Sequence, residues 1–336
     1  MNLYVDIEKE LENTCIKAKF EIGVGEVLSV FGASGSGKSM LLKCIAGIET
    51  PDCGCIRFGD QVFFDSKRKI NLKPQQRKIG YAFQHFALFP NMTVEENIGI
   101  SIPRTERKQK VAEYIKNYNL DGLEKLYPKQ LSGGQKQRVS IARMFASDPN
   151  VFLLDEPFSA LERQLAWELV YEMKRTLERL NCPVIFVSHN KEEVYQLSSK
   201  VAIMEDGTLG TIRDTKDMFS YPKTVQEAYL CGYENLFWLK DGDFLDITRV
   251  PSEEIRAICF DAKAVKFETH HKDDIAFSAI FDQEVEELQF VRYEFLLVSN
   301  AQKRVYMRVN KVDRKCLRVG ESVQLFLCAS DIYHLS

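Results

Sequence analysis

One segment of the chain combines three glycines, three serines and a lysine within eight residues. Its eight residues match the pattern G-x-x-x-x-G-K-[ST], and they are Gly32, Ala33, Ser34, Gly35, Ser36, Gly37, Lys38 and Ser39. Glycines let backbone N–H groups turn inward around phosphate oxygens, and the N-terminus of a helix adds a partial positive charge of about half a unit. We therefore expect a phosphate-binding loop, with Lys38 at the β- and γ-phosphates of ATP and Ser39 as a ligand of Mg²⁺.

Two carboxylates follow an apolar run farther along the chain. Val151–Leu154 reads as a buried strand, and Asp155 and Glu156 come directly after it. Two acids after a strand are most often a solvated turn, but a nucleotide-binding loop upstream favours a catalytic pair. We then expect Asp155 to hold Mg²⁺ through water and Glu156 to face the water that attacks the γ-phosphate.

A third segment, Leu131–Arg138, reads Leu-Ser-Gly-Gly-Gln-Lys-Gln-Arg. With the loop and the carboxylates in this order, the chain resembles the ATP-binding subunits of ABC transporters, whose signature motif this segment matches. The resemblance implies that ATP is bound between two head-to-tail copies of the chain, so we expect a homodimer. It also implies that each copy offers its signature residues to the γ-phosphate held by the other, and these are Ser132, Gly133, Gly134 and Gln135.

Further positions match the family one by one. Gln84 is similar to the Q-loop glutamine, which contacts Mg²⁺ and senses the membrane subunits, and His189 is similar to the switch histidine, which contacts the γ-phosphate. Ser159-Ala160-Leu161 resembles the D-loop. The resemblance thus implies a catalytic set of Lys38, Gln84, Glu156 and His189. The implied Mg²⁺ ligands are Ser39, Gln84 and, through water, Asp155.

The chain departs from the family pattern at two places. Glu162 stands in the D-loop where the family carries aspartate, which is one methylene shorter. No aromatic residue occurs between Tyr4 and Phe20, where the family usually has one that stacks on adenine. Aromatic–base stacking is worth about 1–3 kcal/mol, so the sequence leaves open how adenine is held.

Composition excludes several classes of protein. The chain has 336 residues, with 45 Lys and Arg against 48 Asp and Glu, a formal net charge of −3. This balance argues against dedicated nucleic-acid binding, where a basic face supplies the affinity. The apolar runs are far shorter than the about 20 residues of a bilayer span, and the N-terminus lacks the pattern of a signal peptide. Nine scattered cysteines indicate reduced thiols in a cytosolic protein.

Strand and helix patterns alternate over residues 1–235, which predicts an α/β fold with a parallel sheet. We expect strands at 27–31, 151–154, 184–188, 201–204 and 209–212, and helices at 38–46 and 161–180. Asn190, with Glu193 three residues later, reads as an Asn variant of the capping box that opens another helix. The resemblance implies an ABC-type P-loop NTPase domain over 1–235, with a helical subdomain at about 85–148.

The pattern changes after residue 235. Apolar and polar residues alternate at 305–309 and 323–327, and 290–298 is another strand-like run, which together predict a small all-β domain over 236–336. This segment resembles the OB-like regulatory barrel of several importer ATPases.

Several segments are most similar to the molybdate branch of the molybdate/sulfate importer ATPases, and they are Val62–Ser66, Ile70–Gly80, Ala87–Val94, Val187–Tyr195 and Gly232–Phe237. The resemblance implies a peripheral ATPase on the cytoplasmic side of the cell membrane, with ATP and Mg²⁺ as cofactors. Its implied partners are a separate transmembrane permease, contacted through the apolar run Phe86–Pro90, and an external substrate-binding protein, with no nucleic acid. Sulfate, ferric iron or a polyamine are the alternative cargoes. A soluble, non-transport ABC ATPase is the alternative of another class.

Overall fold

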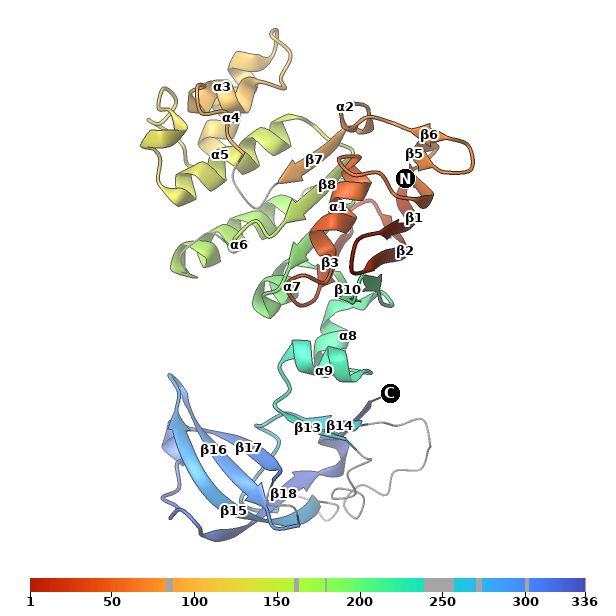
Figure 1. Ribbon diagram of the computed structural model, residues 1–336. Coiled ribbons are helices and arrows are strands. Elements are labelled where there is room, and N and C mark those ends of the chain that lie inside the picture. The colour runs from red at the N-terminus through yellow and green to blue at the C-terminus, as the bar shows by residue number, and fades with distance from the viewer. Residues whose placement is uncertain are drawn as a thin grey trace. The chain divides into compact units, whose positions relative to one another are not determined.

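A computed structural model describes residues 1–82, 87–159, 163–178, 180–238, 257–269, 274–299 and 302–335. These residues form two compact units, Met1–Lys216 and Asp217–Ser336, whose elements are labelled in Figure 1. In the described part of the chain, no helix has both the length and the apolar character that crossing a membrane requires.

A large β-sheet runs through the first unit. Its described strands are β1 (Asn2–Glu10), β2 (Cys15–Gly23), β3 (Val27–Phe31), β4 (Cys53–Phe58), β5 (Gln61–Asp65), β6 (Ile70–Asn71), β7 (Ile79–Ala82), β8 (Val151–Asp155), β9 (Val184–Ser188), β10 (Lys200–Glu205), β11 (Thr208–Leu209) and β12 (Arg213–Asp214). They follow the order β6-β5-β4-β1-β2-β11-β10-β3-β9-β8-β7, and β12 pairs with β10.

The sheet is mixed, whereas the sequence pattern predicted a parallel one. Strands β10, β3, β9, β8 and β7 are parallel neighbours, as predicted for the segments around the phosphate-binding loop. Strands β1, β2, β4, β5 and β6 pair antiparallel. Short turns join β1 to β2 and β4 to β5, and such turns are too short for the helical crossover that parallel pairing needs.

One predicted strand is shorter than expected. The run 209–212 was predicted to return along 201–204, but only Thr208–Leu209 pairs there. The chain leaves the ladder at Gly210, whose N–H donates to the carbonyl of Ile203 at 2.7 Å. It pairs again with β10 at Arg213 and Asp214.

The helices of the first unit follow the strands. They are α1 (Lys38–Ala46), α2 (Pro74–Arg77), α3 (Val94–Gly99), α4 (Arg107–Asn117), α5 (Gly133–Ala146), α6 (Arg163–Leu177) and α7 (Lys191–Leu197), with a 3₁₀ turn at Pro128–Gln130. Helices α3, α4 and α5 pack on one another beside β7 and β8 (Figure 1). They lie within the segment 85–148 that the resemblance gives to a helical subdomain.

Three central strands bring the chemistry-bearing residues to one edge of the sheet. Every residue of β3, β8 and β9 is buried, as expected for parallel strands that are covered on both faces. Because parallel strands end at the same edge, the residues that follow Phe31, Leu154 and Val187 meet there. The fully buried core beneath them includes Leu28, Val30, Leu41, Leu153, Ile185 and Val187.

The second unit is mostly β-structure. It contains most of α8 (Thr215–Ser220), then α9 (Val225–Cys231), β13 (Asn235–Trp238), β14 (Ala257–Phe260), β15 (Asp274–Glu286), β16 (Phe290–Leu297), β17 (Arg304–Asn310), β18 (Ser322–Cys328) and β19 (Tyr333–Leu335). The described strands form two sheets, of order β13-β14-β19 and β17-β16-β15-β18. An all-β arrangement is thus present after residue 235, while the OB-like barrel stays a prediction.

The compact units divide at 216/217, whereas the sequence placed a domain boundary at 235/236. Helices α8 and α9 belong with the second unit because their side chains pack on its strands. Ala228 joins Cys259 and Leu335 in one apolar cluster, and the ring of Tyr221 meets the edge of Tyr333.

Candidate functional site

The phosphate-binding loop connects β3 to α1. Gly35 and Gly37 have φ values of +84° and +103°, which only glycine adopts without strain. Gly32 is needed for space, since a Cβ on it would lie 2.4 Å from the carbonyl oxygen of Met204. The side chains at Ala33 and Ser34 are exposed, so the loop presents its backbone to solvent.

Lys38 starts α1 and is buried beneath the loop. Its Nζ donates to the carbonyl oxygens of Gly32 at 3.0 Å and Ala33 at 2.6 Å. Burial lowers the pKa of Lys38, and the carboxylates of Glu156 and Asp155 oppose that shift. The cation is therefore aimed at the place where the loop would surround phosphate oxygens, with two carboxylates near it.

Asp155 ends β8 with a donor on each carboxylate oxygen. Ser39 Oγ donates to Oδ1 at 2.7 Å, and the Tyr81 hydroxyl donates to Oδ2 at 2.9 Å. Burial raises the pKa of Tyr81, so its phenol stays neutral and keeps its proton as a donor. A serine hydroxyl beside a carboxylate is the oxygen donor set that Mg²⁺ takes next to nucleotide phosphates. The two predicted ligands therefore fit the ion.

Glu156 follows in a strained conformation. Its φ of +45° lies in the left-handed region, which costs a non-glycine residue about 1–3 kcal/mol. Its N–H donates to the carbonyl of Val187 at 3.0 Å, and Ser159 Oγ donates to its carbonyl oxygen at 3.0 Å. These bonds hold the turn at the end of β8.

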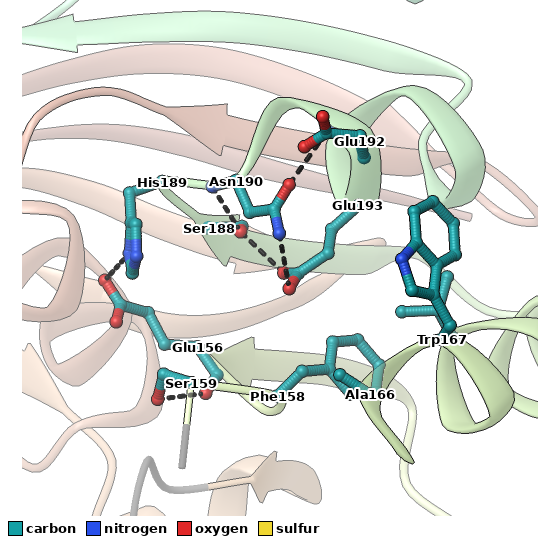
Figure 2. Close-up of a pocket in the computed structure, with 11 residues that line it drawn as sticks. Glu156, Phe158, Ser159, Ala166, Trp167, Ser188, His189, Asn190, Glu192 and Glu193 are labelled. Carbon is teal, nitrogen blue, oxygen red and sulfur yellow. Dashed lines mark hydrogen bonds and ion pairs between the residues drawn. The ribbon is translucent and has the colours of Figure 1, made fainter. Parts of the chain in front are cut away.

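The carboxylate of Glu156 faces His189. Its Oε1 lies 3.2 Å from His189 Nδ1, and the imidazole is half exposed (Figure 2). The pair borders a cavity of about 410 Å³, whose lining residues are Glu156, Phe158, Ser159, Ala166, Trp167, Val170, Ser188, His189, Asn190, Glu192 and Glu193. A carboxylate and an imidazole in contact can together orient a water molecule and share its proton.

The signature residues open helix α5. Ser132 is its N-cap: Ser132 Oγ accepts from the N–H of Gln135 at 3.3 Å, and Gln135 Oε1 accepts from the N–H of Ser132 at 2.9 Å. Because the hydroxyl accepts in this capping box, its hydrogen is directed to another acceptor. Ser132 and Gly133 are exposed and Gly134 is buried, so the helix start presents two small residues to solvent.

Two residues near the site were not predicted from the sequence. Tyr81 binds Asp155, as described above, and the buried Gln137 donates its Nε2 to the carbonyl of Pro157. Tyr81 lies three residues before Gln84, and Gln137 lies inside the signature helix. The signal that could have found them is a polar side chain in an otherwise apolar strand or helix face.

Several predicted residues lie outside the described part of the chain. They are Gln84 of the Q-loop, Phe86 of the proposed permease contact, Ala160 and Leu161 of the D-loop, and Glu162, which departs from the family pattern. The described site brings together Lys38, Ser39, Asp155, Glu156 and His189. Their catalytic roles stay predictions.

Residues 16–159 match the family described as ABC transporter. The chain is 38% identical over 230 residues to the sulfate/thiosulfate import ATP-binding protein CysA of Mesorhizobium japonicum. The matched region covers 65% of each chain. It is 40% identical over 211 residues to the protein CysA 2 of Rhizobium meliloti, covering 60% of this chain and 56% of that one. The chain thus spans less than two thirds of the length of these relatives.

A solved structure has the same fold. It is the dimeric post-hydrolysis state of the ATP-binding cassette MJ0796 bound to ADP and Pi, with a TM-score of 0.53 and 26% identity. The match covers 64% of this chain and 99% of that one. It confirms the predicted ABC-type P-loop fold.

The comparisons do not support the molybdate branch that the sequence segments suggested. The relatives above are named for sulfate and thiosulfate, which was an alternative cargo. What the comparisons do show is that residues 16–159 match the ABC transporter family model and that the chain shares the fold of a solved ATP-binding cassette.

Proposed function

We propose that this chain is the ATP-hydrolysing subunit of an importer that takes up sulfate, thiosulfate or a related oxyanion. Two copies close around two ATP molecules and act on a separate membrane permease, which an external substrate-binding protein loads. The oxyanion rests on the names of the relatives. Hydrolysis rests on one arrangement: Glu156 lies 3.2 Å from His189, at the sheet edge where Ser39 meets Asp155 at 2.7 Å.

Binding begins at the loop of one copy. The backbone N–H groups of residues 33–38 and the Lys38 cation take the phosphates, and Lys38 exchanges its bonds to Gly32 and Ala33 for bonds to phosphate oxygens. Ser39, Gln84 and, through water, Asp155 would hold Mg²⁺, which when bound would neutralise charge on the phosphates. The signature helix of the second copy covers the γ-phosphate from the opposite side.

Hydrolysis then uses the pair at the ends of β8 and β9. Glu156 accepts a hydrogen bond from the attacking water and orients it in line with the γ-phosphate. His189 donates to the γ-phosphate as charge develops on it. After the bond breaks, the contacts that closed the two copies weaken and the dimer reopens.

The variant Glu156→Gln tests the catalytic role. We expect ATP hydrolysis to fall at least about a hundredfold, the low end of general-base effects, while MgATP still binds and closed dimers accumulate in light scattering. Glu205→Gln, at the exposed end of β10, is the matched control and keeps the wild-type rate. Near-normal turnover of Glu156→Gln removes this residue from the role, and a strictly monomeric variant with MgATP contradicts the dimer.

The cargo is tested in the reconstituted complex of the ATPase, its permease and its binding protein. We expect sulfate or thiosulfate to stimulate ATP hydrolysis more strongly than molybdate at equal concentration. Stimulation by molybdate alone restores the original sequence-based hypothesis. Stimulation by a polyamine or ferric iron contradicts both oxyanion assignments and leaves the ATPase role intact.

A further inference from the structure

A small polar network surrounds the backbone of His189. Ser188 is the last residue of β9, and its hydroxyl is buried. Ser188 Oγ accepts from the N–H of Asn190 at 3.0 Å and donates to Glu193 Oε2 at 2.7 Å. Asn190 Nδ2 donates to Glu193 Oε1 at 3.3 Å, and Figure 2 shows these bonds beside the cavity. Glu193 therefore contacts the residues on both sides of His189.

The directions of these hydrogen bonds select an ionised carboxylate. The Ser188 oxygen already accepts from the Asn190 N–H, so its own hydrogen goes to Glu193. The amide group of Asn190 is also a donor. Because both partners donate, Glu193 accepts with both oxygens, and a carboxylate suits this arrangement better than a protonated acid, whose own O–H would need a further acceptor. The pKa of Glu193 is raised, chiefly by burial and also by the nearby Glu156, although the bonds from Ser188 and Asn190 and the nearby His189 oppose this shift.

This arrangement differs from an ordinary helix start. In a capping box, the acid at the third helical position accepts from the N–H of the capping residue. Here Asn190 caps α7 by accepting from the N–H of Glu192 at 3.0 Å, but the Asn190 N–H goes to Ser188. Glu193 instead joins the end of β9 to the cap, so helix α7 and strand β9 are tied together across the histidine.

We propose that Glu193 is a positioning residue which, through Ser188 and Asn190, fixes the backbone on both sides of His189 and so holds the imidazole toward Glu156. This inference rests on the proposed function, in which His189 donates to the γ-phosphate. The imidazole itself is half exposed, so its direction depends on how firmly its backbone is held.

The first test separates kcat from KM. Glu193→Ala removes both acceptors, and we expect kcat for ATP hydrolysis to fall about tenfold, the effect of losing hydrogen bonds to a charged group. KM for ATP stays within about twofold, since Glu193 makes no described contact with the phosphate-binding loop. Glu193→Gln keeps one accepting oxygen, so we expect its kcat to lie between those of the wild type and Glu193→Ala. Glu192→Gln, the exposed neighbour that also loses one negative charge, keeps the wild-type kcat.

The second test asks whether the effect passes through His189. In a His189→Ala background, we expect Glu193→Ala to change the residual rate by less than about twofold, because the group it positions is gone. A merely structural role lowers the rate by the same factor in both backgrounds. Ser188→Ala removes the same bridge from the other side and reproduces Glu193→Ala, which keeps the test valid if one variant folds poorly.

The third readout needs no ATP hydrolysis. The Asn190 N–H is protected by Ser188, so we expect hydrogen exchange in the peptide 186–192 to quicken about tenfold in Glu193→Ala and to stay unchanged in Glu192→Gln. If wild type hydrolyses no ATP, the proposed function fails while the exchange result still reports on the backbone. If wild type is active and the Glu193 variants match Glu192→Gln in both kcat and exchange, this inference alone is overturned.

Discussion

Two adjacent carboxylates have different environments. Asp155 has a donor on each oxygen, Ser39 at 2.7 Å and Tyr81 at 2.9 Å, so its orientation is fixed. Glu156 sits in a left-handed turn and faces His189. A rigid carboxylate suits a metal site, whereas a carboxylate beside an imidazole and a cavity suits the orientation of water.

The contact between Tyr81 and Asp155 gives a prediction about Mg²⁺. Tyr81→Phe removes only the hydroxyl that orients Asp155. We expect the Mg²⁺ concentration that half-saturates ATP hydrolysis to rise about tenfold, as for other outer-shell partners of metal ligands. Titration of the ATPase rate with Mg²⁺ measures it, and Tyr171→Phe, whose ring is exposed, is the control. An unchanged Mg²⁺ titration shows that Ser39 alone suffices to orient the carboxylate.

At the scale of elements, the C-terminal end of helix α1 is held by a side chain from helix α2. Arg77, fully buried at the end of α2, donates to the carbonyl oxygens of Cys44 at 3.0 Å and Ile45 at 2.7 Å. It also donates to the carbonyl of Leu72 at 3.0 Å. Helix ends leave carbonyls without partners, and at the end of α1 this guanidinium supplements the N–H groups of Gly47, Ile48 and Glu49, which bond to the carbonyls of Cys44 and Lys43. Burial lowers the pKa of Arg77 to about 10, which reflects the cost of placing the cation there.

Removing this cap should destabilise the first unit. Arg77→Met removes the guanidinium donor from the carbonyls of Cys44, Ile45 and Leu72, of which Cys44 still accepts from the N–H of Gly47, and we expect a loss of about 3 kcal/mol in the free energy of unfolding. Urea unfolding followed by circular dichroism measures it. Arg68→Met, at an exposed site, is the control and changes stability by less than about 0.5 kcal/mol. Equal stability of the two variants means that water replaces the guanidinium.

The elements were predictable from sequence where local pattern decides them. The run Val27–Phe31 and the helix at 38–46 follow from an apolar stretch, a glycine loop and a helical pattern in direct succession. Strands β1 and β4 were not predicted, although short turns join them to β2 and β5, and the pairing of β1 with β4 joins segments about 50 residues apart and leaves no local signal. The capping role of Asn190 was predicted correctly.

The contacts that organise the site were harder to predict. The chemistry of Lys38, Asp155 and Glu156 could be predicted from local sequence, because Lys38 lies in a phosphate-binding motif and the two acids directly follow an apolar strand. Tyr81 and Gln137 did not, since their partners are set by the register of β7 against β8 and by the packing of α5. Glu193 was expected to bind the backbone of its own helix, but it binds Ser188 in the preceding strand.

At the scale of the molecule, nine free cysteines are distributed over both units. Cys44 and Cys182 are buried in the first unit and Cys259 in the second, while Cys53 and Cys316 are exposed. Burial raises the pKa of Cys44 and Cys182 to about 11 and that of Cys259 to about 12. The thiolate is the reactive form. Burial therefore protects these three thiols by blocking access to them and by keeping them protonated.

Thiol labelling of the full chain therefore reports on each unit. In the native protein at pH 8, we expect iodoacetamide to label Cys53 and Cys316 and to spare Cys44, Cys182 and Cys259. With increasing urea, Cys44 and Cys182 become reactive together, and Cys259 at a different midpoint, if the units unfold separately. Peptide mass spectrometry reads each site. A single common midpoint shows that the two units unfold as one.

The bond from Gln137 to the carbonyl of Pro157 has a mechanical consequence. It fastens the helix that begins with Ser132 to the peptide that comes immediately after Glu156. A contact that tilts helix α5 through α3 or α4 would therefore also shift the turn that orients the Glu156 carboxylate. Under the proposed function, the orientation of Glu156 thus depends on the position of helix α5, and loss of the Gln137 amide would uncouple ATP hydrolysis from transport.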